Sequence, residues 1–177
     1  MTDFVRIANL EKYLFENVGK TFRDKGKLSP LDLFLILHWK SRRAKNKNRD
    51  KLKMKSGSFG KATKQIAASL QKANSPEERL RVLMEKWGLR LPTASAILTV
   101  LYPEHFTIYD IRVRDQLGLD RMRESYSAAH WNTMWDSYLQ FKNMVIENTP
   151  SNLCLRDKDR YLWGKSLYED AERDHRS

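Results

Sequence analysis

Residues 87–113 constrain the fold of this chain more than any other segment. Their sequence, WGLRLPTASAILTVLYPEHFTIYDIRV, begins with the end of one helix and a tight turn that opens at Gly88. An apolar helix rich in small residues follows, and then a loop that contains Pro103 and ends at Asp110, where a third helix starts. A helix N-terminus leaves its first backbone N–H groups without partners, so this arrangement can present donors to a phosphate. The segment therefore predicts a phosphate-binding turn with an aspartate close behind it.

Helical patterns extend over most of the remaining chain. Ser29 followed by Pro30 predicts a helix start, and so does the capping box from Ser75 to Glu78. We expect further helices over 3–18, 60–73, 127–147 and 156–171, with 156–160 as a solvated face and 170–177 frayed. The stretch 43–58 contains asparagines and glycines and predicts a long loop. The fold class we expect is all-α, with a single domain over residues 1–177.

The hairpin and the aspartate lie at a spacing that is typical of one family. The hairpin run 88–94, GLRLPTA, fits the form L-P-G-V-G-x-K-T-A, and Asp110 lies 18 residues after Pro92. Together with the Thr-Ala pair at 93–94, the apolar run 97–101 and the Tyr-Asp pair at 109–110, this segment resembles the helix–hairpin–helix–GPD superfamily of DNA glycosylases. The resemblance implies a two-lobed helical fold with a central lobe of about 28–108. Both termini would form the second lobe, and an extruded base would occupy the cleft between the lobes.

Two residues depart from the family pattern. Arg90 stands where a second hairpin glycine is usual, and Pro92 stands where bifunctional members carry the lysine that forms a Schiff base. Proline within a chain offers no amine, so the resemblance implies a monofunctional enzyme that leaves an intact abasic site. Lys40, which follows an apolar helix and Trp39, is either a phosphate contact or a substitute amine in the cleft. The alternative to an enzyme is a non-catalytic helix–hairpin–helix DNA-binding protein.

Asp110 is the candidate catalytic residue. Cleavage of an N-glycosidic bond builds positive charge on the sugar, and a fixed carboxylate beside C1′ stabilises that charge and can orient a water. An aspartate before a helix is also a common N-cap, which stabilises the helix by about 1 kcal/mol. The two roles are compatible, because the N–H groups at a helix start keep a carboxylate ionised. An extruded base also needs a wall to stack on, and the candidates for it are Trp39, Tyr109 and Trp163, for each of which core packing is the alternative.

The net charge of +11 is concentrated between Lys40 and Lys64, where eleven basic residues accompany one acid. A concentrated basic segment attracts polyanions, so we expect double-stranded DNA as the partner. The predicted contacts to the DNA backbone are Lys40, Arg42, Arg43 and Lys45, together with Gly88, Leu89, Arg90, Leu91 and Thr93. A lysine-rich loop without a partner, or a protein that binds RNA or another protein, would explain the charge but not the spacing from the hairpin to the aspartate.

The sequence also excludes several classes of protein. A single cysteine, Cys154, excludes a disulfide framework and the iron–sulfur cluster of one branch of the resembled superfamily. The four histidines show no ligand spacing, so we expect no transition-metal site, and the resemblance implies only Na⁺ or K⁺ at the hairpin carbonyls. The longest apolar run, 33–37, is too short to span a bilayer, and the N-terminal residues have no signal-peptide profile. We expect a monomer without an obligate protein partner, in the cytoplasm, and with the nucleoid if the source is a bacterium.

Overall fold

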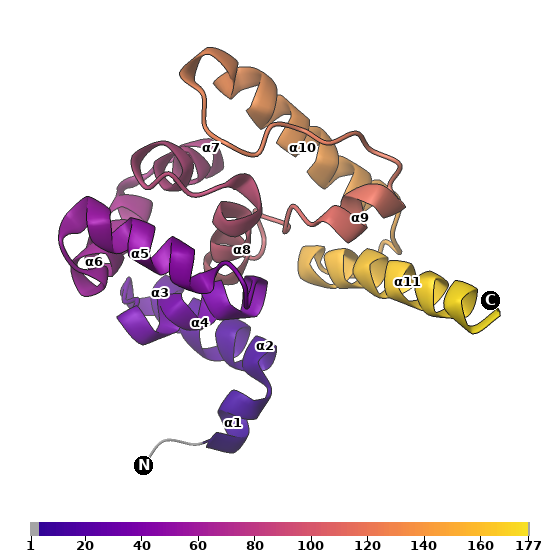
Figure 1. The fold of residues 1–177 in the computed structure, drawn as a ribbon, viewed down its shortest axis with the longest axis horizontal. Helices are drawn as coiled ribbons and strands as arrows, with labels where there is room; N and C mark the ends of the chain where they lie inside the picture. Colours follow the sequence, from indigo (N-terminus) through magenta and orange to yellow (C-terminus); the bar gives the residue numbers. More distant parts are fainter. Residues whose placement is uncertain (1–3, 177) are drawn as a thin grey trace.

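The computed structural model describes residues 4–176, and all regular secondary structure within that range is helical (Figure 1). The first half of the chain forms α1 (Phe4–Ala8), α2 (Leu10–Tyr13), the π-helical segment η1 (Leu14–Gly19), α3 (Lys20–Lys25), α4 (Pro30–Lys40), α5 (Lys45–Ser56) and α6 (Phe59–Lys72). The second half forms α7 (Pro76–Arg81), the π-helical η2 (Val82–Lys86), α8 (Leu91–Leu101), α9 (Ile111–Gln116), the short 3₁₀-helix η3 (Ala128–His130), α10 (Trp131–Glu147) and α11 (Leu155–Arg176). The prediction of an all-α protein is confirmed.

Helix α8 is the centre of the fold. Leu91 and all residues of 94–101 are buried, and α3, α4, α7 and η1 pack around them. Segment η1 crosses α8 at Gly19, where an added Cβ would come within 2.2 Å of the carbonyl oxygen of Val100. The lack of a side chain at Gly19 therefore allows η1 to approach the backbone of α8 closely, and α8 becomes a rigid support for the loop that follows it.

Polar side chains cap the helices that the sequence predicted. The hydroxyl of Ser29 accepts from the N–H of Asp32 at 3.0 Å, and the hydroxyl of Ser75 accepts from the N–H of Glu78 at 3.1 Å. Both predicted helix starts are thus confirmed. The single helix expected over 3–18 is instead interrupted at Asn9, whose side chain accepts from the N–H of Lys12 and caps α2. Position 3 lies outside the described residues.

The basic segment is a helix, so the prediction of a long loop over 43–58 is wrong. Helix α5 covers Lys45–Ser56 and packs on α4 and α6. Lysine, arginine and methionine are good helix formers, and the fully buried Leu52 anchors the helix to the core. The glycine that suggested a loop instead ends the helix, since Gly57 has a φ of +83°. Helix α11 continues to Arg176 and so includes most of the tail that was expected to fray over 170–177, while position 177 lies outside the described residues.

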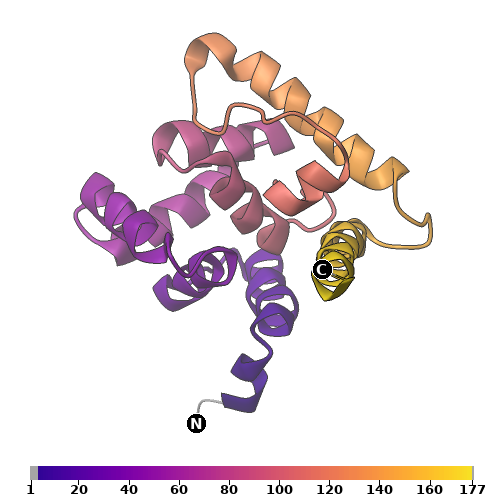
Figure 2. The ribbon, with the colours of Figure 1, turned by 45° about the vertical axis from the view of Figure 1, so that its right-hand side comes forward.

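The helices form two groups with α8 and the loop after it between them (Figures 1 and 2). Segment η1 packs on α4 and α8, whereas α11 packs on α9 and α10. Segment η1 thus contacts the central helices, while the division into a central lobe of about 28–108 and a lobe built from both termini stays a prediction. An ion pair between Glu11 of α2 and Arg156 of α11 connects the two groups. None of the helices in the described part of the chain has the length and apolar character needed to cross a membrane.

Candidate functional site

Asp110 lies at the start of α9 with both carboxylate oxygens engaged. Its Oδ1 accepts from the N–H of Arg112 at 3.1 Å, which is the geometry of an N-cap. Its Oδ2 accepts from Nζ of Lys40, at the end of α4, at 2.6 Å. The Asp110 side chain is 23% exposed and that of Lys40 is 15% exposed, so the pair is largely withdrawn from solvent. The same carboxylate thus caps a helix and forms an ion pair across the two groups of helices.

Buried hydrogen bonds fix the loop that delivers Asp110. The hydroxyl of Ser95 in α8 accepts from the N–H of Tyr109 at 3.0 Å. The hydroxyl of Tyr138 in α10 donates to the carbonyl of Thr107 at 2.8 Å and accepts from its N–H at 3.2 Å. Burial raises the pKa of Tyr138, so its hydroxyl keeps the proton that it donates. With three backbone groups bound by buried side chains, the position of Asp110 is set by the core.

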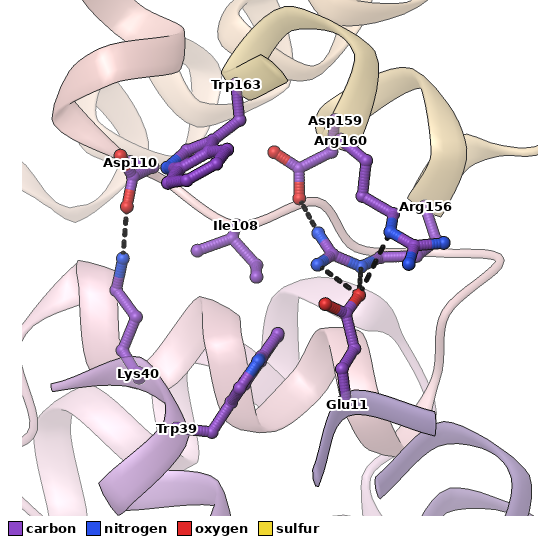
Figure 3. A pocket seen from close by; sticks show the side chains of 9 residues that line it. All are labelled: Glu11, Trp39, Lys40, Ile108, Asp110, Arg156, Asp159, Arg160 and Trp163. Carbon is purple, nitrogen blue, oxygen red and sulfur yellow. Dashed lines mark hydrogen bonds and ion pairs between the residues drawn. The ribbon is translucent and has the colours of Figure 1, made fainter. Parts of the chain in front are cut away.

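A cavity of about 510 Å³ opens beside this carboxylate. Its volume lies within the range of about 300–1,000 Å³ that is common for small-molecule sites. Figure 3 shows the side chains that surround it, which come from α2, α4, the loop before α9, and α11: Glu11, Trp39, Lys40, Ile108, Asp110, Arg156, Asp159, Arg160 and Trp163. The structure therefore brings Asp110, Lys40 and two of the three aromatic residues predicted for a base pocket around one space.

The third predicted aromatic residue, Tyr109, belongs to the core. It is 2% exposed, its ring meets the edge of Phe141 at 5.2 Å, and its hydroxyl accepts from the N–H of Met122. The side chain points away from the cavity because Asp110 and Tyr109 are neighbours in an extended loop and face opposite sides. Core packing, the alternative for each of the three residues, is what the structure shows for Tyr109.

Trp39 and Trp163 differ in how firmly they are held. Trp39 meets Phe15 edge-on at 5.8 Å, and the guanidinium of Arg156 lies over its ring at 5.3 Å. Trp163 projects from α11 next to Asp110 and is 43% exposed (Figure 3). One wall of the cavity is thus fixed by packing, whereas the other can adjust to what enters.

The far side of the cavity carries a buried charge network that the sequence analysis missed. Arg156 donates to Oε1 of Glu11 at 2.6 Å and forms an ion pair with Asp159. Burial raises the pKa of Asp159 to about 6, and this effect outweighs the attraction of Arg156, while the charge of Asp110 adds to it. The sequence predicted a solvated face over 156–160. In the structure, Arg156, Asp159 and Arg160 of this segment line the cavity instead. The helical spacing of Arg156, Asp159, Arg160 and Trp163 was the available signal, because these residues fall on one side of a helix.

The turn before α8 uses some of the backbone groups that were expected to meet phosphate. The N–H of Leu89 donates to the carbonyl of Leu83 at 3.0 Å, and that of Leu91 donates to the carbonyl of Glu124 at 2.7 Å. Both side chains are buried. Within the described residues, the N–H groups of Gly88 and Arg90 donate to no protein acceptor. The structure thus leaves two N–H groups of this turn for an external acceptor, rather than four.

Arg90 stands where the family that the sequence resembles has a glycine, and its backbone is unstrained. Its φ of −79° and ψ of 154° are extended, and the left-handed position of the turn is taken by Gly88, with a φ of +66°. A non-glycine residue is therefore tolerated at position 90. The Arg90 guanidinium pairs with Glu124, which also pairs with Arg121 at 3.2 Å. The ion pair between Arg90 and Glu124 connects the turn to the segment after α9.

Helix α5 is attached to the turn through lysine ammonium groups. Nζ of Lys51 donates to the carbonyl of Gly88, and Nζ of Lys55 donates to the carbonyl of Lys86, each at 2.8 Å. The amide of Asn48 donates to the hydroxyl of Thr93 at 3.4 Å. An internal cation thus already contacts one of the carbonyls at which Na⁺ or K⁺ was expected. Two of the basic residues of the 40–64 segment serve the fold in this way.

Other basic residues of the same segment are exposed next to the cavity. Arg42 and Arg43 lie in the short connection between Lys40 and α5, and both are exposed. Nζ of Lys45 donates to the carbonyl of Arg42 at 3.0 Å, which closes this connection. Two exposed cations therefore lie within three residues of a cavity-lining lysine. We refer to Arg42, Arg43, α5 and the turn at Gly88 as the basic face.

No protein-family model matches this chain, and no significant match is found among curated proteins or among solved structures. The site is therefore interpreted from its own geometry.

Proposed function

We propose that this protein is a DNA glycosylase that extrudes a damaged or modified base from double-stranded DNA and excises it with the help of Asp110. The observation that carries the proposal is the position of the Asp110 carboxylate, at the edge of a cavity of about 510 Å³ and close to the basic face. The cavity, the two tryptophans and the exposed cations come from separate parts of the sequence. Their convergence on one carboxylate supports a site for a flipped base.

The chemistry asked of Asp110 is stabilisation of a cation. As the bond between base and sugar breaks, positive charge develops at C1′ and O4′, and a fixed negative charge lowers the energy of that state. The N-cap bond from Arg112 holds the carboxylate in one orientation. Its partial withdrawal from solvent strengthens the interaction, because the effective dielectric constant is lower there. Water is the simplest nucleophile, and Pro92 excludes an amine at the hairpin position.

The cavity supplies stacking and polar recognition. Trp39 and Trp163 offer aromatic surface that compensates for the stacking lost on extrusion, which amounts to a few kcal/mol. Asp159 presents a carboxyl to the same space, and its pKa of about 6 allows it to accept or donate a hydrogen bond near neutral pH. Its partner Arg156 donates only. The cavity can therefore form hydrogen bonds with both donors and acceptors on the edge of a base.

The DNA backbone would follow the basic face. Arg42 and Arg43 would neutralise phosphates near the extruded nucleotide, and the N–H groups of Gly88 and Arg90 would bind another phosphate, as at other helix N-termini. Because Lys51 holds the carbonyl of Gly88, the turn would already have this shape before DNA binds. Such preorganisation reduces the entropy lost on binding.

The test uses labelled duplexes that each carry one candidate lesion or modified base. Base release is scored as strand scission after alkali, for the wild type and for Asp110→Asn. Asparagine is an equally good N-cap, so the variant keeps the cap of α9 but loses the negative charge. The proposal is supported if the wild type releases the base from one duplex and the variant does not, while both bind that duplex with the same affinity. The duplex from which base is released then identifies the substrate base.

A non-catalytic DNA-binding protein is the second candidate, and one observation favours it. The ion pair with Lys40 already occupies Oδ2 of Asp110, as a purely structural carboxylate would be occupied. This hypothesis predicts tight, salt-sensitive DNA binding and no base release from any duplex. The Asp110→Asn variant would then differ from the wild type only in stability.

A further inference from the structure

We infer that Lys40 is a catalytic residue, whose amine forms an imine with C1′ of an abasic sugar and so gives the protein a lyase activity. This goes beyond base excision by hydrolysis and departs from the monofunctional enzyme that Pro92 implies. It relies on the proposed function only in that the cavity holds the sugar of an extruded nucleotide.

Lys40 lies at the edge of the cavity, beside the Asp110 carboxylate. Its Nζ lies 2.6 Å from Oδ2 of Asp110 and lines the same cavity as Trp39 and Trp163 (Figure 3). A sugar whose C1′ is placed against the Asp110 carboxylate is therefore within reach of this amine as well. Position 92 of the hairpin is proline and offers no amine, so Lys40 would supply the amine from another part of the chain.

The surroundings of Lys40 differ from those expected of a residue that only contacts phosphate. The exposed Arg42 and Arg43 are directed to solvent, as residues that follow a DNA backbone should be. Lys40 is instead 15% exposed and is paired with a carboxylate inside the cavity. A cation that only bound phosphate would gain nothing from this partner, which neutralises its charge. A nucleophilic amine must release a proton before it can attack, and the Asp110 carboxylate lies within hydrogen-bond reach to accept that proton.

Imine formation begins with a proton transfer. The ammonium gives one proton to the Asp110 carboxylate, and the nitrogen lone pair forms a bond to the aldehyde carbon C1′ of the ring-opened sugar. Loss of the C1′ oxygen as water gives the imine. Asp110, ionised again after it has returned its proton to the leaving C1′ oxygen, then accepts a proton from C2′. The C2′–C3′ double bond forms, and the C3′–O bond breaks so that the 3′ phosphate leaves with its strand. Hydrolysis of the imine returns the Lys40 amine.

The experiment uses the full chain and a duplex with one abasic site, prepared by removing uracil with a separate enzyme. Sodium borohydride supplies hydride to C1′ of any imine and converts it into a stable secondary amine. We expect a covalent protein–DNA adduct in denaturing gels, with the cross-linked peptide containing Lys40, and strand scission without alkali when borohydride is omitted.

The matched variant is Lys40→Arg, with Lys142→Gln in α10 as the control, since Lys142 belongs neither to the cavity nor to the basic face. Arginine keeps the positive charge and can keep the ion pair with Asp110, but its guanidinium stays protonated and forms no imine. We expect the adduct and the scission to be lost in Lys40→Arg and retained in Lys142→Gln, whose side chain reaches the backbone carbonyl of His105 outside the cavity. Thermal melting and DNA affinity of Lys40→Arg should match the wild type, so that the loss is not one of folding.

The outcomes distinguish this inference from the proposed function. Equal trapping of Lys40→Arg and wild type, or an adduct that maps to another amine, overturns the inference. Base release from a lesion duplex without any trapped adduct also overturns it, and leaves the glycosylase proposal intact. Trapping at Lys40 without base release from any duplex supports the inference and counts against excision.

Discussion

Nζ of Lys40 lies 2.6 Å from Oδ2 of Asp110, although 70 residues separate the two in the sequence. The contact joins the end of α4 to the start of α9 and places an amine and a carboxylate at one edge of the cavity. Removal of one partner leaves the other partly buried without a counter-charge, which is unfavourable. Variants that keep the charge or the cap are therefore more informative at these positions than alanine.

Asp110→Asn should slow base release strongly while DNA affinity stays within a factor of a few. The amide keeps the acceptor for the N–H of Arg112 but cannot stabilise a cation at C1′. Loss of one such electrostatic contribution typically lowers kcat by about 100- to 1,000-fold. Single-turnover assays of base release, run beside DNA-binding titrations, measure the two effects separately.

Asp115→Asn is the matched control for this variant. Asp115 lies in the same helix, is largely exposed, and pairs with Arg114 outside the cavity. Its replacement should leave base release unchanged. An equal loss in both variants would show that the site responds to any damage in α9, and Asp110 would then have no special role.

Trp163→Ala should slow base excision with little change in thermal stability. The side chain is 43% exposed, so its removal leaves only a small part of the core unfilled. Stacking of a base on an aromatic ring is worth about 1–3 kcal/mol, which corresponds to roughly a 5- to 150-fold loss. Trp163→Phe should recover part of it. Tyr161→Ala is the control, because Tyr161 is 46% exposed on the same helix and does not line the cavity; equal losses at 161 and 163 would contradict stacking.

Replacement of both Arg42 and Arg43 by glutamine should flatten the salt dependence of DNA binding. Each phosphate neutralised contributes a slope of about −0.9 to the plot of log affinity against log salt, so the pair accounts for about 1.8. Titrations at several salt concentrations give this slope directly. The double variant of Arg173 and Arg176, near the end of α11, removes the same charge elsewhere and should keep the wild-type slope. If it flattens the plot equally, net charge rather than the basic face steers the DNA.

The sequence was informative where local rules dominate. Serine caps, the apolar periodicity of α8 and the helix start at Asp110 all depend on neighbouring residues, and the structure has them at the expected places. Helix α5 was missed because asparagines and a glycine suggested a loop. What stabilises it is non-local: Leu52 is buried against the core, and Lys51 reaches the turn at Gly88. Propensity within the segment cannot report such contacts.

The site was predictable only in part for the same reason. Asp110, Trp39, Lys40 and Trp163 were each candidates from the sequence, but their common cavity depends on how α11 packs on α9 and α10. The wall at Asp159 was missed because a segment of alternating charges usually indicates a solvated helix face. Burial of Asp159 is set by residues far away in the chain, and the partner Glu11 lies in α2.

DNA binding should be indifferent to the choice of monovalent cation. The Lys51 ammonium already donates to the carbonyl of Gly88, so Na⁺ or K⁺ is not needed to hold the turn. Affinity should agree in Na⁺, K⁺ and a bulky organic cation at equal ionic strength, which keeps the counterion contribution constant. Lys51→Gln should weaken binding more than Lys53→Gln, because Lys53 is exposed on the same helix and its replacement removes the same charge without loosening the turn. A preference of the wild type for K⁺ over the organic cation would contradict this role of Lys51.

Asp159 should make the stability of the protein depend on pH around its pKa of about 6. Burial is the main cause of the raised pKa, and the charge of Asp110 adds to it, while Arg156 and Lys40 act in the opposite direction. The folded protein thus binds this proton more tightly than the unfolded chain does, where the pKa is near 3.8. The stabilisation that this bound proton gives the folded protein is complete at pH values below the pKa of the unfolded chain, and it is lost as the pH rises through about 6.

Comparison with Asp159→Asn measures this contribution, since asparagine does not titrate. The free energy of unfolding of the wild type, minus that of the variant, should fall as the pH rises from about 4 to about 7 and then stay constant. One pKa unit corresponds to about 1.4 kcal/mol, so the total change should be on the order of 3 kcal/mol. Urea unfolding at several pH values gives the difference. A difference that is constant over this range would show that Asp159 stays ionised, and that the attraction of Arg156 then outweighs burial.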